Sequence, residues 1–232
     1  MPYRITPFVS EYFYHLFNRG VEKRIIFSNE RDYQRFLQTL YYYQFSGPKP
    51  RFSMYTRYKD KDFSQNPKIV EVICYCLMPN HFHILIKQIR GGGIQEFMQK
   101  VINSYTKYYN TKHKRVGHLF QGTFKAVPVE TEAQLLHVSR YIHLNPYASE
   151  LTDDLEGYPY SSYPHFISLK HDHLCESGII LESFKDGANY KRSLKASPEN
   201  EFASSAYKEF VSGHGDYARE LEQLKHLLLD PD

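Results

Sequence analysis

The sequence contains little cysteine and no long apolar run, and each scarcity excludes a class of protein. Only Cys74, Cys76 and Cys175 occur in 232 residues, which argues against a disulfide framework. Cys74 and Cys76 lie two apart in a strand-like run without a CxxC pair, so we expect reduced core residues rather than a metal site. No apolar run reaches the ~18 residues that a membrane helix needs, and the first residues lack a signal segment. These features predict a cytoplasmic protein without a membrane partner.

The charge is unevenly distributed along the chain. Residues 1–128 carry 20 Lys/Arg and 8 Asp/Glu, net +12, whereas residues 129–232 carry 9 and 18, net −9. A basic first part suggests a partner that bears phosphates. The chain also has 21 Tyr and 16 Phe, and aromatic faces stack on unpaired bases while Lys and Arg follow the backbone. A solvated surface of mixed sign is the plainer alternative.

The apolar periodicity predicts an α+β fold in residues 1–148. Asn29 is positioned to cap the first helix. Thr131 and Gln134 match a capping box at the start of the third helix, and that helix should end near Pro146. The order of elements is typical of a ferredoxin-like or RRM-like antiparallel sheet with helices on one face. The predicted strands are 11–17, 68–78, 81–87 and 123–129, and the predicted helices are 30–45, 94–110 and 131–145.

Residues 149–232 are predicted to form a C-terminal extension that is partly helical. Helices are expected at 203–211 and 217–229, and an ordered turn at 158–163 (YPYSSY). The segment 47–67 is rich in Lys, Arg, Pro and Ser and is expected to be a basic loop. The sequence therefore predicts two parts, 1–148 and 149–232.

His81 and His83 are the candidate metal ligands. They are one residue apart on a predicted strand, so both project from the same side. Phe82, Ile84 and Ile86 share the other, apolar side, which suits the core. The histidines are therefore expected on the open face of the sheet, where two imidazoles can bind one divalent cation. A pair of surface histidines without a ligand is the alternative for an isolated HxH pattern.

Tyr141 is the candidate nucleophile. In the helix 131–145, Leu135, Val138 and Ile142 form the predicted core stripe. Tyr141 and Asn145 lie on a neighbouring stripe, four residues apart, and so face the same region. The Asn145 carbonyl oxygen is a suitable ligand for Mg²⁺ or Mn²⁺.

Together these groups match the needs of phosphodiester cleavage, which are a nucleophile and neutralisation of charge on the phosphoryl oxygens. Attack by a tyrosine would keep the bond energy in a phosphotyrosine link, which suits strand transfer better than digestion. Because an ordinary tyrosine has a pKa near 10, a metal or basic neighbour must activate it. His143, Arg140 and Lys125 are the candidates, and the sequence does not choose among them.

Several ordered motifs resemble the HUH superfamily, specifically the REP-associated tyrosine transposases and their insertion-sequence relatives. The resemblance runs from about Tyr14 to Tyr163. Its segments are YHLFNRGVEKRIIF (14–27), CLMPNHFHILI (76–86), SYTKYYN (104–110), GHLFQGTFKA (117–126), YIHLNP (141–146) and YPYSSY (158–163).

The resemblance implies a function for each candidate. In the family the two histidines bind a divalent metal, and they match His81 and His83. The nucleophile matches Tyr141, and the amide four residues later matches Asn145. The family cuts single-stranded DNA near hairpins through a 5′-phosphotyrosine intermediate, which implies Mg²⁺ or Mn²⁺ as cofactor, single-stranded hairpin DNA as partner and a monomer or homodimer.

Residues that contact the DNA are expected in the basic first part. By resemblance, these are Arg19, Lys23 and Arg24. Lys125, named above as a candidate activator of Tyr141, is a further DNA-binding candidate.

Three alternatives remain open at this point. Tyr105 and Tyr109 also lie four apart on a helix, although packing or base stacking suits them better. A non-catalytic module with an RRM-like sheet would bind single strands without metal or cleavage. A zinc hydrolase is disfavoured, since no HExxH motif occurs.

Overall fold

The computed structural model describes residues 7–55, 57, 63–185, 199–216 and 218–219. The predicted helix at 217–229 therefore lies outside the described residues, apart from 218–219. The chain packs into two compact units. The first comprises residues 1–72 and 79–130, and the second comprises residues 73–78 and 131–232.

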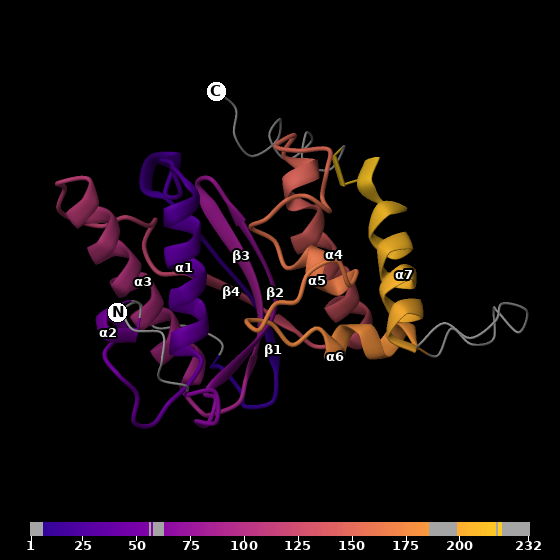
Figure 1. Ribbon diagram of the computed structural model, residues 1–232, viewed down its shortest axis with the longest axis horizontal. Coiled ribbons are helices and arrows are strands. Elements are labelled where there is room, and N and C mark those ends of the chain that lie inside the picture. Colours follow the sequence, from indigo (N-terminus) through magenta and orange to yellow (C-terminus); the bar gives the residue numbers. More distant parts are fainter. Residues whose placement is uncertain (1–6, 56, 58–62, 186–198, 217, 220–232) are drawn as a thin grey trace, which may run out of the picture. The chain divides into compact units, whose positions relative to one another are not determined.

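A four-stranded antiparallel sheet with the order β2-β3-β1-β4 forms the framework of the fold (Figure 1). Both strands next to β1 run antiparallel to it. With helices in the connections β1 to β2 and β3 to β4, this order is that of a ferredoxin-like sheet, so the predicted α+β fold class is confirmed. The strands are β1 (Phe13–Arg19), β2 (Val70–Met78), β3 (His81–Gln88) and β4 (Lys125–Val129).

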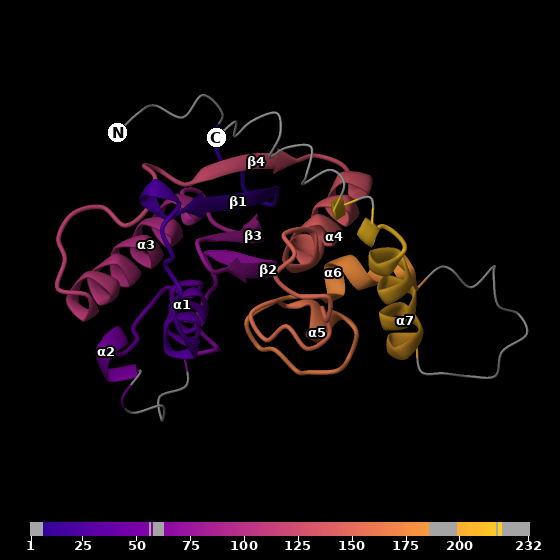
Figure 2. The ribbon, with the colours of Figure 1, turned by 90° about the horizontal axis from the view of Figure 1, so that it is seen from above.

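Helices α1 (Glu30–Tyr43) and α3 (Gly93–Lys112) lie on one face of this sheet (Figure 2). As predicted, Asn29 caps α1, and its side chain accepts a hydrogen bond from Asp32 N. The core between helices and sheet is aromatic, because the Phe36 ring of α1 packs 5.1 Å from the rings of both Phe82 and Tyr105. The apolar face of β3 therefore points where the alternation predicted.

The expected basic loop at 47–67 contains a helical turn, α2 (Phe52–Tyr55), preceded by an ordered lysine. Lys49 Nζ lies 4.0 Å from the centre of the Tyr42 ring and donates to the carbonyls at the end of α1. Apart from this turn, the described residues of the segment form a loop as expected, and Phe52 and Phe63 are buried against Tyr42. A short 3₁₀ turn, η1 (Val21–Lys23), follows β1.

The second unit is built on the helix α4 (Glu132–Ala148). Thr131 and Gln134 form the predicted capping box. The helix ends at Ala148, near Pro146 as predicted. It continues two residues beyond the proline, which removes one backbone donor but does not prevent Ser149 N from bonding to Asn145 O. The other helical elements are α5 (Tyr163–Phe166), α6 (Gly178–Leu181), η2 (Glu182–Phe184) and α7 (Glu199–Ser212).

Both edges of the sheet carry features that interrupt strand pairing. On the outer side of β2, Val72 N donates to the Gln44 side chain. Further along, Leu77 N bonds to Tyr160 O, and Ser162 N bonds to Tyr75 O, so the predicted turn at 158–163 is ordered and lies along the strand. At the opposite edge, β4 is short and contains Pro128.

The division into compact units differs from the two parts predicted from sequence. It falls at Thr131, ahead of the predicted boundary after Ala148, because α4 packs with α6 and α7. The assignment of residues 1–148 to a catalytic domain is a functional one and stays a prediction. None of the three cysteines forms a disulfide and all are buried, as expected. Among the described residues, no helix has the length and hydropathy to cross a membrane.

Candidate active site

The two histidines of the HxH pattern lie side by side on β3, on the face opposite α1 and α3. Their ring centres are 5.1 Å apart and nearly perpendicular. In the register of the sheet, His83 lies opposite Phe17 of β1 and His81 lies opposite Arg19. The predicted orientation of the pair is confirmed.

The expectation of an open face was wrong at His83, which is only 6 % exposed. The rings of Phe17 and His15 stack near it, at 5.8 Å and 5.1 Å between ring centres. His81 is half-buried. The histidine pair therefore lies in an aromatic environment at the surface of the sheet.

A third histidine, His15 on β1, was missed by the sequence reasoning. Its Nε2 lies 2.9 Å from His83 Nδ1. Burial lowers the pKa of His15 from 6.5 to about 4, so His15 is neutral at neutral pH. The signal was present in the sequence, because His15 and Phe17 alternate on one side of β1 as the histidines do on β3.

The donor atoms of the pair fit a divalent cation. His81 Nδ1 lies 2.6 Å from Asn80 Oδ1, and His83 Nδ1 contacts His15. Each δ nitrogen is thus held by a neighbour, which makes Nε2 the ligating atom, an arrangement typical of metal-binding histidines. Within the described part of the chain, no three His, Cys, Asp or Glu residues are grouped to hold a metal, so a cation on this pair would need further oxygen ligands, such as an amide or water.

Tyr141 and Asn145 lie on α4 in the second unit. The Tyr141 side chain is 36 % exposed, whereas Asn145 is 5 % exposed. Asn145 Nδ2 donates to the Tyr141 backbone oxygen at 3.1 Å, so the carbonyl oxygen is the atom of this amide suited to a metal. The meeting of this helix with the histidine pair of the first unit stays a prediction.

The predicted core stripe of α4 was partly wrong. Leu135 and Ile142 are buried, but Val138 is only half-buried. The polar residues Ser139 and His143 take the buried positions instead. They can do so because each finds hydrogen-bond partners inside the second unit.

His143 is excluded as the group that activates Tyr141. Its Nδ1 lies 2.7 Å from the Tyr207 hydroxyl and its Nε2 lies 2.8 Å from Ser162 Oγ. Burial lowers the pKa of His143 from 6.5 to about 3. A fully buried imidazole with both nitrogens engaged cannot accept the phenolic proton.

The other two activator candidates have different positions. The Arg140 guanidinium lies 4.3 Å from the centre of the Phe210 ring and contacts His137, so it packs within the second unit. Lys125 on β4 lies opposite Phe17 and is exposed. Because Phe17 also lies opposite His83, Lys125 and the histidine pair share one face of the sheet. Lys125 is therefore the basic candidate that the first unit places on the same face as His81 and His83.

The candidate DNA contacts Arg19, Lys23 and Arg24 lie at the end of β1 and in η1. Arg19 is next to His81, and its buried Nε has no hydrogen-bond partner in the described chain. Arg24 pairs with Glu22 at 3.0 Å. Lys23 is exposed, and its backbone oxygen accepts from Asn80. Of the three, Arg19 is the one that the strand register places opposite His81.

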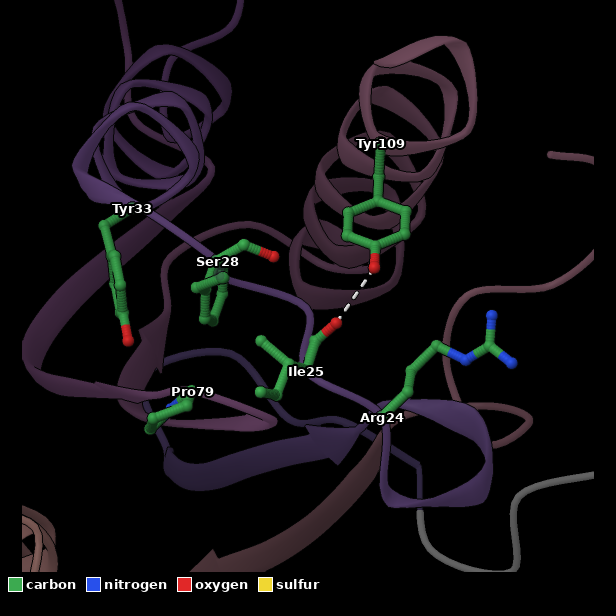
Figure 3. A pocket seen from close by; sticks show the side chains of 7 residues that line it. Arg24, Ile25, Ser28, Tyr33, Pro79 and Tyr109 are labelled. Carbon is green, nitrogen blue, oxygen red and sulfur yellow. Dashed lines mark hydrogen bonds between the residues drawn. The ribbon is translucent and has the colours of Figure 1, made fainter. Parts of the chain in front are cut away.

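Arg24 also lines an open pocket of about 660 Å³ in the first unit (Figure 3). Its wall contains the Tyr109 ring, whose hydroxyl donates to Ile25 O at 2.9 Å. The nearby Tyr105 is fully buried, and its hydroxyl donates to Ile26 O at 2.5 Å. Burial raises the pKa of Tyr105. Both tyrosines hold the segment after β1 in place, so neither is a suitable nucleophile.

Part of this sequence is similar to a known protein family. A family model described as transposase IS200-like matches part of the sequence. The match covers residues 56–145. The predicted resemblance to insertion-sequence transposases is thereby confirmed, and the IS200-like stretch includes His81, His83, Tyr141 and Asn145.

Two further comparisons concern solved structures and curated proteins. A solved structure of a REP-associated tyrosine transposase bound to a REP hairpin is similar to this chain with a TM-score of 0.49 and 13 % identity. The alignment covers 76 % of this chain and 97 % of that chain. No curated protein matches the sequence.

Proposed function

We propose that the protein is a metal-dependent endonuclease and strand transferase acting on single-stranded DNA that contains a hairpin. The observation that carries the proposal is the histidine pair, whose δ nitrogens are both held by neighbours, within a stretch that matches IS200-like transposases. Such transposases process DNA. The hairpin as substrate comes from the motif resemblance.

The reaction follows from the side chains. The Tyr141 hydroxyl oxygen attacks the scissile phosphorus, and the bond from phosphorus to the 3′ oxygen breaks. The phenolic proton passes to a base or water, and the leaving 3′ oxygen takes up a proton. The product is a 5′-phosphotyrosine link and a free 3′ hydroxyl, with nothing oxidised or reduced. The reverse attack by a 3′ hydroxyl rejoins the strand.

A divalent cation held by His81, His83 and Asn145 would neutralise charge on the phosphoryl oxygens. Arg19 supports the same task, since its unpartnered Nε next to His81 can donate to a phosphate oxygen. Lys125 on the same face adds positive charge along the strand or accepts the phenolic proton. The aromatic ring of Phe17 between them suits stacking on an unpaired base.

The decisive experiment is covalent trapping. A hairpin oligonucleotide with a single-stranded flank is incubated with the protein and Mg²⁺ or Mn²⁺, and adducts are resolved on a denaturing gel. We expect an adduct with the wild type, its loss with EDTA, and its loss in Tyr141→Phe while DNA binding persists. Tyr147→Phe, on the same helix, is the matched control and should form the adduct.

Two outcomes would contradict the proposal. An adduct that persists in Tyr141→Phe would rule out this nucleophile. Salt-sensitive binding without an adduct in any metal would favour the second candidate, a non-catalytic single-strand-binding module on an RRM-like sheet. That candidate is supported by the aromatic and basic residues Phe17 and Lys125 on the histidine-bearing face.

A further inference from the structure

We infer that His15 is a positioning residue, which holds the His83 imidazole in the tautomer and orientation that metal binding requires. The inference rests on the proposed function, because it assigns a partner to one of the metal ligands proposed there. It concerns a residue of β1 that lies 68 positions from His83 in the sequence.

The contact is specific in its geometry. His15 Nε2 and His83 Nδ1 are 2.9 Å apart, and the two rings are inclined by 25°. His15 lies opposite Leu85, so it reaches His83 diagonally across the β1–β3 ladder. Both imidazoles are less than 10 % exposed, and Phe17 packs against both. The β1–β3 ladder and the Phe17 ring therefore both hold the two imidazoles in place.

The chemistry of ligation fixes the position of each proton. A neutral histidine that gives the Nε2 lone pair to a metal carries its proton on Nδ1. The His83 Nδ1–H then donates to His15 Nε2, so His15 must accept with Nε2 and carry its own proton on Nδ1. This hydrogen bond selects one tautomer of His83 and makes its ligating nitrogen a better donor.

Two other roles for His15 make different predictions. If His15 served packing alone, a leucine of similar volume would replace it without effect on metal binding. If His15 were itself a ligand, its Nε2 would have to leave His83 and bind the cation. The positioning role instead requires only a hydrogen-bond acceptor at the place of Nε2, which a glutamine side chain can supply.

The test compares three variants of the full-length protein by Mn²⁺ affinity, measured by electron paramagnetic resonance without DNA. His15→Leu removes the acceptor and is expected to weaken Mn²⁺ binding by about 10- to 100-fold, the usual cost of losing such a partner. His15→Gln restores an acceptor and should recover most of the affinity. His118→Leu replaces an exposed histidine of the same unit and should bind Mn²⁺ as the wild type does.

Nitrogen-15 spectra of the wild type give a second readout, which stands even if His15→Leu fails to fold. We expect the Nδ1–H tautomer at both His15 and His83, and on addition of Mg²⁺ a large shift at His83 Nε2 but not at His15 Nε2. A direct shift at His15 Nε2, the other tautomer at His83, or unchanged Mn²⁺ affinity in a folded His15→Leu would each overturn the inference.

Failure of this inference is distinguishable from failure of the proposed function. If the wild type and His83→Gln bind Mn²⁺ equally weakly, the metal site itself is wrong. If His83→Gln loses Mn²⁺ but folded His15→Leu does not, the metal site stands and the role of His15 is overturned.

Discussion

Both units of the protein contain buried histidines, and His83 of the first unit and His143 of the second are engaged in different ways. His143 of the second unit has both ring nitrogens bonded inside that unit, to Tyr207 and Ser162. His83 of the first unit contacts another imidazole through Nδ1 and is surrounded by rings on a sheet face. Burial alone therefore does not separate a structural histidine from a candidate ligand. The identity of the partner at each nitrogen does.

Within α4, the buried His143 and the nearby Tyr141 have different roles. His143 lies two residues from Tyr141, yet it faces the interior while Tyr141 is exposed. One helix thus presents an internal hydrogen-bond network on one side and the proposed nucleophile on another. Sequence proximity to the nucleophile is a poor guide to the activating base.

The largest expected effect comes from replacing His83 and His143, one at a time, with glutamine. His83→Gln should reduce Mn²⁺ affinity and adduct formation by more than about 100-fold, because it removes a proposed ligand. The free energy of unfolding should change little. His143→Gln should leave Mn²⁺ affinity nearly unchanged and should lower the free energy of unfolding. Adduct yield, Mn²⁺ titration and urea denaturation measure adduct formation, metal affinity and the free energy of unfolding. An equal loss of Mn²⁺ affinity in both variants would show that the two histidines do not differ in role.

The next effect concerns Asp32, the internal polar group of the first unit. It is fully buried; burial tends to raise its pKa, but hydrogen bonds from Lys112, Tyr108 and Ser28 N outweigh this and lower it. A lowered carboxyl pKa contributes stability above the ordinary aspartate pKa, and that stability is lost as pH falls through the lowered value.

Asp32→Asn should therefore cost about 2–3 kcal/mol at pH 7, because a charged partner loses its bonds. The difference from the wild type should shrink as pH falls below the ordinary aspartate pKa, and it should be smallest once pH has passed the lowered value at which the folded carboxyl is protonated. Urea denaturation at pH 7 and at a series of pH values from 4 downward tests both points. A pH-independent difference would show that the charge of Asp32 is unimportant.

A smaller effect is expected from Tyr207→Phe in the second unit. The hydroxyl joins His143 and Ser139, and its removal leaves buried polar atoms without a partner, at a cost of about 1–3 kcal/mol. Urea denaturation measures the loss. Tyr147→Phe, whose hydroxyl bond is exposed, should change stability by less than about 0.5 kcal/mol. Equal values for the two would show that the network does not stabilise the unit.

The smallest effect is expected at single phosphate contacts. Lys125→Gln should weaken binding of single-stranded DNA modestly and reduce the slope of log affinity against log salt by about 0.7. Lys170→Gln, an exposed lysine of the second unit, is the control and should leave the slope unchanged. Fluorescence anisotropy from 50 to 300 mM salt gives both values. An unchanged slope for Lys125→Gln would remove it from the DNA-binding surface.

The sequence predicted the fold and the faces of the histidine pair because both depend on local alternation. Strand and helix periods, the Asn29 cap and the capping box at Thr131 are readable within a few residues. His15 was missed because its role depends on the strand register across the sheet, which local patterns do not contain. The buried position of His143 was missed for a similar reason, since its partner Tyr207 lies 64 residues away. The same dependence on tertiary contacts produced the error in the core stripe of α4.

The two outer strands also constrain how the protein associates with itself. A proline in a strand is tolerated where its missing N–H would point away from the neighbouring strand, so Pro128 removes a donor from the outward side of β4. On β2, Gln44 and the 160–162 segment use donors and acceptors that another chain would need. Continuous strand-by-strand joining of two sheets is thereby discouraged at both ends. A homodimer of this protein should use side-chain surfaces instead, and the protein should resist edge-driven aggregation.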